Sequence, residues 1–335
     1  MPADLGILAG MIDQQEAPPR KVSLGARVVT GLLVLATVPL VVLVAMRLLG
    51  IDGNAYTTAA LALTPYLTVA GFLLGVLALV LRRWKTGAVV LVLVAALVSV
   101  VVPRMVAEEQ PAVTGRDLRV MASNLFLGRA EAQSIVDLVR ANQVEVLSLL
   151  ELSPAMVGDL ERAGLFTLLP HRVLHPIRGG AGSGLVSKYP LTEANLAGPS
   201  RLRQPSARVE FGDGSGVEIV AVHPMPPVEA PADWKAELAG LPEPTADLPV
   251  RILAGDFNAT FDHASFRELI DAGYADAAAE LGKGWRPTWP GKVFPPPVTI
   301  DHILVDDRVA VRDFQVFDVA ASDHDAVYAQ LTVPV

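Results

Sequence analysis

The chain has 335 residues, of which 52% are hydrophobic and 19% are charged, and its formal net charge is −8. This hydrophobic excess excludes a disordered chain and is typical of a protein with segments inside a membrane. The sequence contains no cysteine, which excludes a disulfide scaffold, a zinc site built from thiolates and a cysteine nucleophile.

Three long apolar segments follow one another near the N-terminus: Val28–Leu49, Thr57–Leu81 and Gly87–Pro103. Each is close to the ~20 residues that a helix needs to cross the hydrocarbon of a bilayer. Buried core helices and a cleaved signal peptide are the alternatives, and the low charge and the number of the segments disfavour both. We therefore predict a tail (1–27), a membrane domain with three transmembrane helices (28–103) and a globular domain (104–335).

Basic residues indicate how these spans are oriented. Six of them lie on one side of the membrane: Arg20, Lys21, Arg27, Arg82, Arg83 and Lys85. The other side has only Arg47 and Arg104, at span ends where we expect their side chains to extend toward water. The positive-inside rule then predicts a multi-pass protein of the cell membrane, with a cytoplasmic N-terminus and an extracytoplasmic globular domain.

Polar residues gather at the start of the second apolar segment. They are Thr57, Thr58, Thr64, Pro65 and Tyr66. Two interpretations stay open: these residues line a groove that faces lipid, or they pack the helices against each other.

The globular domain combines many short strands with few helices. Nine segments rich in Val, Ile and Leu are predicted as strands: Leu118–Phe126, Val144–Leu150, Gly184–Tyr189, Ala207–Phe211, Val217–Val222, Val250–Ala254, Thr299–Val305, Val309–Phe317 and Ala326–Val333. Four segments have helical spacing: Glu131–Ala141, Pro154–Ala163, Asp233–Leu241 and Ala264–Ala272. This pattern predicts an α/β fold in which two sheets pack face to face with helices outside.

Polar residues recur where these apolar strands end or begin. They are Asn124, Glu151, His223, Asp256, Asn258, Asp301, Asp323 and His324. Any one of them alone is typical of a turn or a helix cap. Their recurrence at so many strand ends predicts a single site.

The motifs SNL, ELS, GSGLVSKYPL, VHPMPP, GDFNAT, TWP, IDHIL and SDH resemble, in this order, those of the endonuclease/exonuclease/phosphatase superfamily. These metal-dependent phosphoesterases include deoxyribonuclease I, apurinic endonucleases and neutral sphingomyelinases. The resemblance spans nearly all of residues 118–333 and implies a four-layer αββα sandwich. The three-span layout also resembles membrane-anchored bacterial relatives that are linked to glycopeptide resistance and prenyl pyrophosphate hydrolysis.

The resemblance implies a role for each polar residue. Glu151 is the expected metal ligand, with Asn124 beside it and Asp323 as a second carboxylate. An all-oxygen ligand set suits Mg²⁺, with Mn²⁺ as an alternative.

The same resemblance implies the residues that carry the reaction. Asp256 orients or deprotonates the attacking water, or protonates the leaving oxygen. His324 contacts phosphate or transfers a proton, with Asp301 behind it, and the division of this work between Asp256 and His324 stays open. His223 and Asn258 are expected to contact the phosphate or the leaving oxygen.

Other residues receive weaker interpretations. The glycine-rich segment 178–184 lacks the Lys-Ser/Thr ending of a phosphate loop, so it is expected to be a rim loop from which Arg178 reaches substrate. His302 is expected to point away from the site, and His263 to cap or pack a helix. Trp285 and Trp289 are expected to anchor loops or to form an aromatic rim.

Three functions remain: a phosphoesterase for a lipid-linked phosphate or pyrophosphate such as undecaprenyl pyrophosphate, a surface nuclease, and a silent binding module. A phospholipid phosphodiesterase is a variant of the first. Residues 104–335 contain 20 basic and 31 acidic residues, a balance that disfavours nucleic acid as a partner. The complete set of polar residues disfavours the binding module. We therefore expect a membrane lipid or lipid-linked phosphate as the substrate, whereas nothing in the sequence indicates the oligomeric state.

Overall fold

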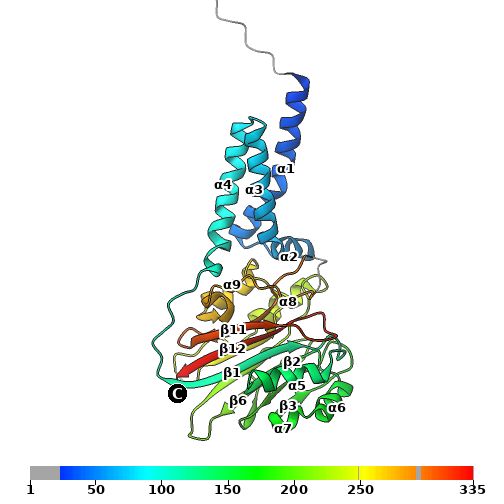
Figure 1. Cartoon of the computed structure of the whole chain (residues 1–335), viewed down its shortest axis with the longest axis vertical. Coiled ribbons are helices and arrows are strands. Elements are labelled where there is room, and N and C mark those ends of the chain that lie inside the picture. The colour runs from blue at the N-terminus through cyan, green and yellow to red at the C-terminus, as the bar shows by residue number, and fades with distance from the viewer. Residues whose placement is uncertain (1–22, 248, 292–295, 335) are drawn as a thin grey trace, which may run out of the picture.

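The computed structural model describes residues 23–247, 249–291 and 296–334. A stalk of helices stands on a larger globular part (Figure 1). Arg20, Lys21 and most of the predicted tail lie outside the described residues.

The stalk contains α1 (Leu24–Leu49), α3 (Thr64–Val80) and α4 (Trp84–Val101), followed by the short 3₁₀ helix η1 (Pro103–Met105). The three long helices pack around a small apolar core that includes Leu40, Leu43, Val90 and Leu97. Two of them, α1 and α4, are each long and apolar enough to cross a membrane. Two of the three predicted spans are therefore supported as single helices.

The prediction of one continuous helix over the second apolar segment is wrong. This segment forms α2 (Ala55–Ala62) and α3, which are bent by 66°. Pro65 lies in the first turn of α3, where its missing N–H costs nothing, whereas inside a longer helix it would remove a hydrogen bond. The 17 residues of α3 span about 26 Å, so a third span by length requires α2 and α3 together.

The globular part contains two six-stranded mixed sheets. In spatial order, the first consists of β11 (Ala310–Phe317), β12 (Ala326–Pro334), β1 (Gly115–Asn124), β2 (Val146–Leu150), β4 (Ser183–Ser187) and β3 (His171–His175). The second consists of β5 (Leu191–Ala194), β6 (Ser206–Glu210), β7 (Gly216–Val222), β8 (Arg251–Asp256), β10 (Asp301–Asp306) and β9 (Tyr274–Asp276). All nine predicted strands are present.

Helices cover the outer face of each sheet (Figure 1). The first sheet is covered by α5 (Ala132–Ala141), α6 (Pro154–Ala163) and α7 (Leu165–Leu168), and the second by α8 (Pro231–Ala239) and α9 (Ala264–Asp271). The short α10 (Ala277–Glu280) packs against β10 and β11.

The cores follow from the alternation of side chains along each strand. On β1, Val120 packs between the two sheets, whereas its neighbour Met121 packs outward against the first helical layer. Trp234 of α8 and Leu253 of β8 belong to a third core, on the outer face of the second sheet. The layers are therefore helix, sheet, sheet, helix, as predicted.

Strand direction brings the polar strand ends to one edge. In the first sheet β1 and β2 are parallel and β12 is antiparallel to β1, so the ends of the first two lie next to the start of the third. The second sheet repeats this arrangement, since β7 and β8 are parallel and β10 is antiparallel to β8, with Asp301 directly opposite Asp256.

Candidate active site

The predicted polar residues meet in one cleft with a volume of about 530 Å³. Six of them line it: Glu151, His223, Asp256, Asn258, Asp323 and His324. Asn124 and Asp301 lie directly behind and hydrogen-bond to residues of the lining. Segments up to 200 residues apart in the chain thus form one site, as the strand directions require.

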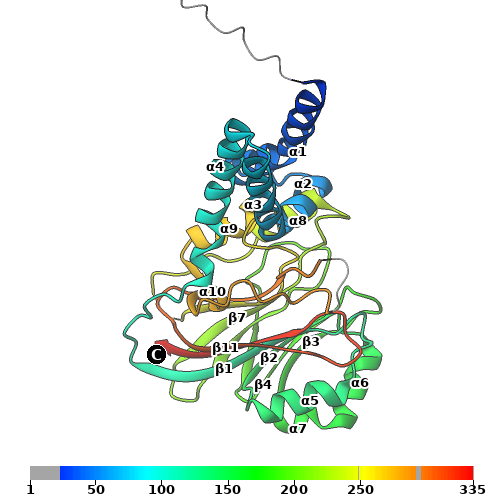
Figure 2. The same cartoon turned by 45° about the horizontal axis from the view of Figure 1, so that its top comes forward.

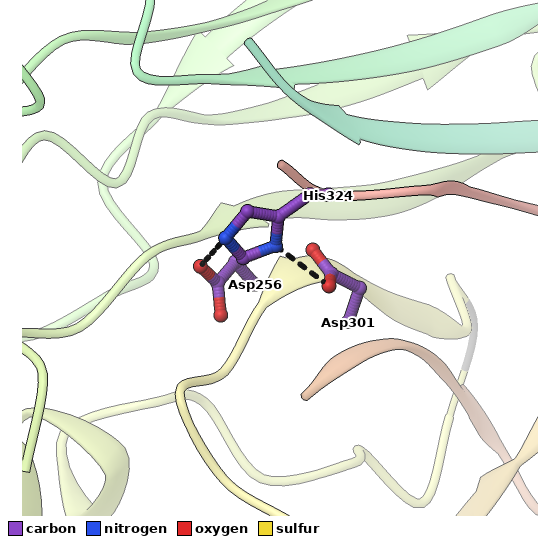
Figure 3. Close-up of side chains that lie close together, drawn as sticks. All are labelled: Asp256, Asp301 and His324. Carbon is purple, nitrogen blue, oxygen red and sulfur yellow. Dashed lines mark hydrogen bonds and ion pairs between the residues drawn. The ribbon is translucent and has the colours of Figure 1, made fainter. Parts of the chain in front are cut away.

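His324 lies between two carboxylates (Figure 3). Its Nδ1 is 2.9 Å from Oδ2 of Asp301, and its Nε2 is 3.8 Å from Oδ2 of Asp256. Burial alone would lower the pKa of His324, but the negative charges of Asp301 and Asp256 outweigh it and raise that pKa to about 10. His324 is therefore a cation at neutral pH, whose Nδ1–H donates to Asp301.

Asp256 binds its proton more strongly than an ordinary carboxylate does. It is buried, and burial together with repulsion from Asp301 raises its pKa to about 6, although His324 and His223 act in the opposite direction. Because Asp256 lies in the cleft lining beside an imidazolium, it is suited to accept a proton from a bound water.

Glu151 and Asp256 are held together by one amide. Nδ2 of Asn124 donates to Oε1 of Glu151 at 3.2 Å and to Oδ2 of Asp256 at 3.0 Å, while Oδ1 of Asn124 accepts from the N–H of Phe126. The N–H of Leu127 donates to Oε2 of Glu151. Asn124 thus presents its NH₂ to the carboxylates, which favours a positioning role, and its predicted role as a ligand stays a prediction.

The carboxylates of the cleft fit a hard cation. Burial is the main cause that raises the pKa of Glu151, and Asp323 adds to it by repulsion. Oδ1 of Asp323 is buried and has no hydrogen-bond partner among the described residues. Carboxylate oxygens crowded away from water are unfavourable without a counter-ion, and oxygen ligands suit Mg²⁺ or Mn²⁺.

A second grouping of metal-binding side chains occurs nearby. One ligand atom from each of Asp256, Asp301 and His324 lies within 4.8 Å of the others. Here, however, Nδ1 of His324 already bonds to Asp301, and the imidazolium itself supplies the positive charge. This geometry favours the prediction of a cation on the side of Glu151 and of proton transfer by this trio.

His223 and Asn258 complete the lining. Nε2 of His223 is 3.9 Å from both Oε1 of Glu151 and Oδ2 of Asp256, and burial lowers the pKa of His223, so its ring is neutral. The backbone N–H of Asn258 donates to Asp256, and its Nδ2 donates to the carbonyl of Pro224 at 3.1 Å. Both residues line the cleft, and their contacts with a phosphate group stay predictions.

The sequence did not indicate that Trp289 contacts Asp323. Its Nε1 donates to Oδ2 of Asp323 at 3.2 Å, and its ring lies 6.3 Å from that of His324. Trp289 therefore orients Asp323 and forms part of the cleft wall, which combines the two interpretations offered for it. Trp285 instead lies edge-on to Tyr66 of α3.

Four residues of the lining or its support have left-handed backbones. Phe126, Leu127, Glu151 and Asn258 have φ between +47° and +57°. Residues other than glycine adopt this region rarely, and such strain is often found at functional sites. At Glu151 the sharp change of direction follows the end of β2.

Arg178 is exposed and does not line the cleft. The same loop nevertheless contacts the site, because a Cβ at Gly180 would lie 3.4 Å from the carboxylate of Glu151. Gly182 has no space for a side chain, since a Cβ there would be 2.2 Å from the carbonyl oxygen of Leu152. The glycine-rich segment is thus a rim loop as predicted, and its glycines rather than Arg178 reach the site.

The other histidines have structural contacts. His302 is buried away from the cleft, with Nδ1 2.7 Å from Asp276 and Nε2 3.0 Å from the carbonyl of Ala259, as expected. His263 also packs as expected, but its Nε2 donates to the carbonyl of Thr58 in α2 at 2.9 Å.

The expectation that Arg47 and Arg104 extend toward water is wrong. Both are buried and share the carboxylate of Asp262, with N–O distances of 3.1 and 2.9 Å. Burying these cations is tolerated because Asp262 neutralises part of their charge. The ends of α1 and α4 are thereby fixed to the globular part.

Two solved structures of D. rerio TDP2 support the fold. Zebrafish (D. rerio) TDP2 complexed with a single-strand DNA product has a TM-score of 0.51, with 17% identity over 65% of this chain and 99% of that one. A humanized D. rerio TDP2 with 14 mutations has a TM-score of 0.52 at 17% identity, with the same coverage. An endonuclease/exonuclease/phosphatase from Beutenbergia cavernae DSM 12333 has a TM-score of 0.49 and 19% identity, over 65% of this chain and 72% of that one.

A comparison of the sequence with protein families gives a direct assignment. None of the curated proteins matches the chain significantly. Residues 121–324 match the family described as Endonuclease/Exonuclease/phosphatase family, and this range contains every predicted catalytic and metal-binding residue. The chain therefore belongs to the endonuclease/exonuclease/phosphatase family.

Proposed function

We propose that the protein is a membrane-anchored phosphoesterase that uses Mg²⁺ or Mn²⁺ to hydrolyse a lipid-linked phosphate or pyrophosphate, such as undecaprenyl pyrophosphate. One observation carries the proposal: the cleft that contains Glu151, Asp256 and His324 is also lined by Thr58, Ala59, Ala62 and Leu63 of the apolar N-terminal region. A site walled by a segment next to the membrane is suited to a substrate held in the bilayer.

Charge supports the same choice. The globular part has 31 acidic and 20 basic residues, so a polyanion meets net repulsion that a bound cation offsets only locally. The name of the D. rerio structure includes a DNA product, but at 17% identity this likeness concerns the fold. Nuclease activity is therefore the alternative function, and the assay described below tests it.

The geometry suggests how the chain's own residues act. The His324 imidazolium, fixed by Asp301, donates from Nε2 to a phosphate oxygen in the cleft. Asp256 accepts the proton of the attacking water. The pKa values favour this division of work, because His324 holds its proton more strongly than Asp256 does.

Other side chains bind and orient. Glu151, with Asp323, would hold the divalent ion, and Asn124 keeps Glu151 beside Asp256. When bound, the ion withdraws charge from a non-bridging phosphate oxygen. Neutral His223 donates from Nε2 to the phosphate or to the leaving oxygen.

We further propose that α1, the α2–α3 pair and α4 form three spans, with the catalytic domain outside the cytoplasm. Arg82, Arg83 and Lys85, where α3 connects to α4, lie at the end of the stalk that is remote from the catalytic part (Figure 1), next to the start of α1, where Arg83 donates to the carbonyl of Ala26. Basic residues at this end favour the cytoplasmic side.

The test is an assay of the purified full chain in detergent micelles. Its substrates are a polyprenyl pyrophosphate, a phosphatidic acid, a diacyl phospholipid and plasmid DNA, at equal phosphate concentration with Mg²⁺. We expect a prenyl or other lipid phosphate to be hydrolysed faster than DNA. Rapid cleavage of plasmid without hydrolysis of any lipid would replace this proposal with a nuclease, and preference for the phospholipid would indicate a phosphodiesterase.

A further inference from the structure

The short helix α2 lies across the globular part rather than along the stalk, and Figures 1 and 2 both place it next to α8. Its position is fixed by polar contacts on each side. Oδ2 of Asp52 accepts from the N–H of Ser265 at 2.9 Å, and Oδ1 of Asp52 is 3.4 Å from Nζ of Lys235 in α8. The carbonyl of Thr58 accepts from His263.

A second contact fixes the start of α3. Oη of Tyr66 donates to the carbonyl of Pro297 at 2.6 Å, in the segment that leads to Val298 and Ile300 of the cleft. Together with Asp262, which holds Arg47 and Arg104, these bonds make α2 a fixed part of the catalytic unit. The N-terminal region therefore does more than anchor the enzyme.

The cleft changes character along its length. Its inner end contains Glu151, Asp256 and His324, whereas its outer end lies between α2 and the loop Pro226–Glu229. The α2 face turned to the cleft presents Ala59, Ala62 and Leu63, and the opposite loop presents Pro226, Pro227 and Val228, whose exposed fraction is 57%. Small residues on the helix leave space, and in this part of the lining the apolar residues of both walls outnumber the polar ones, which are Thr58, Glu229 and His263.

We infer that this outer end of the cleft is a binding site for the hydrocarbon chain of the substrate, which leads from the phosphate at Glu151 out between α2 and Val228 toward the bilayer. The inference rests on the proposed function and names the residues that select substrates with a long hydrocarbon chain. The outer end belongs to the same cleft as the carboxylates. A substrate whose phosphate lies at the inner end must therefore place the group esterified to that phosphate at the outer end. An apolar chain is the portion that such walls stabilise.

The orientation of α2 is consistent with this path. Tyr56 of α2 is 89% exposed, and Ile51 and Leu48 just before it are also exposed. Tyrosine side chains with an exposed hydroxyl and apolar neighbours are typical of the interface between lipid and water. A chain that leaves the cleft beside α2 enters the hydrocarbon without crossing water.

The experiment measures KM for isoprenyl pyrophosphates of five, ten and fifteen carbons, with full-length protein in detergent and release of phosphate as the readout. Each fully buried CH₂ contributes about 0.8 kcal/mol, or about a fourfold change in KM. We expect KM to fall by at least about tenfold per five-carbon unit until the groove is filled. Unbranched alkyl phosphates of the same lengths, run in parallel, identify whether isoprenoid or acyl-type chains fit better.

Two variants alter the groove from opposite walls: Ala59→Phe on α2 narrows it, and Val228→Asp on the loop places a charge in it. Each should raise KM for the fifteen-carbon substrate by at least about tenfold and so reduce the ratio of KM between five and fifteen carbons. Ala59 and Val228 are both exposed, so neither change disturbs the core. Ala60→Phe, on the same helix but outside the cleft lining, is the matched control and should retain the parent ratio.

The outcomes separate the two proposals. If the parent prefers long chains and both variants keep the parent ratio of KM between five and fifteen carbons, the groove assignment is wrong while the proposed function stands. Equal KM at all lengths in the parent also overturns the groove. If the parent hydrolyses no prenyl or alkyl phosphate but cleaves DNA, both the proposed function and the groove assignment are wrong.

Discussion

Asp301 lies directly opposite Asp256 in the pairing of β10 with β8, yet only Asp301 hydrogen-bonds to His324, at 2.9 Å. Adjacent strands thus place two carboxylates on one imidazolium, one at each ring nitrogen. One carboxylate fixes the ring, and the other remains available to the cleft.

Replacement of Asp301 tests this arrangement. Asp301→Asn removes the negative charge that most raises the pKa of His324, so the proton on His324 is lost at lower pH than in the parent. We expect kcat to fall by about 10²–10⁴-fold and the alkaline limb of the pH–rate profile to move to lower pH. An unchanged profile would contradict a role for His324 as a proton-bearing group.

Glu151 should be essential for metal binding. Glu151→Gln keeps the shape of the side chain but removes the charge, and we expect loss of most turnover and weaker binding of Mn²⁺ in calorimetry. Glu193→Gln, an exposed carboxylate paired with His175, is the control. Chelation of the parent with EDTA should abolish hydrolysis until Mg²⁺ or Mn²⁺ is restored, so full activity in EDTA would exclude the proposed mechanism.

Asp262 should matter more for stability than an exposed acidic residue does. Asp262→Asn leaves Arg47 and Arg104 buried with reduced compensation, which costs about 3–5 kcal/mol. We expect the midpoint of thermal unfolding in detergent to fall by several degrees. Asp233→Asn, which breaks an exposed pair with Arg201, should cost less than about 1 kcal/mol. Equal effects of the two variants would argue against a buried ion cluster.

His263 makes the docking of α2 sensitive to acid. Burial lowers its pKa below the ordinary 6.5, and in the neutral form Nδ1 accepts from Thr260 while Nε2 donates to Thr58. The folded state thus binds fewer protons than the unfolded state, so this stabilisation is complete above pH 6.5 and is lost as pH falls through the lowered pKa. Urea unfolding at several pH values should show a smaller acid-dependent loss in His263→Asn than in the parent.

The absence of cysteine allows a direct test of topology. Ser200 is unsuitable as a labelling site because its hydroxyl is buried, whereas Glu161 on α6 is exposed. Glu161→Cys should react with an impermeant thiol reagent on intact cells, and Lys85→Cys, in the first turn of α4, only after lysis. The reverse pattern would place the catalytic domain in the cytoplasm.

The sequence predicted the interior of the sheets better than their edges. The strands that it missed, β3, β5 and β9, are all edge strands. They are short, and in β3 only Val173 is buried, so these strands lack the runs of apolar residues that identify a central strand. A strand with one neighbour and one open side has little need of them.

The catalytic residues of the cleft were predictable from the sequence for a related reason. The wall that α2 forms at the outer end of the cleft was not. Every predicted catalytic residue lies at or near the end or the start of a buried apolar strand. The apolar residues of these strands can be recognised in the sequence. The contribution of α2 depends instead on a 66° bend and on contacts such as Thr58–His263, which join residues 205 positions apart. Hydropathy averaged over a window cannot show a change of direction, although Pro65 marks its place.

The shared carboxylate of Asp262 has a consequence for the enzyme in different membranes. Because one side chain holds the ends of both α1 and α4, those ends cannot shift in depth relative to each other. A bilayer thicker or thinner than the stalk must then be accommodated by tilting of the whole molecule or by deformation of the lipid. Turnover should consequently vary with acyl-chain length in reconstituted vesicles, since tilting changes the distance between the cleft and the lipid headgroups.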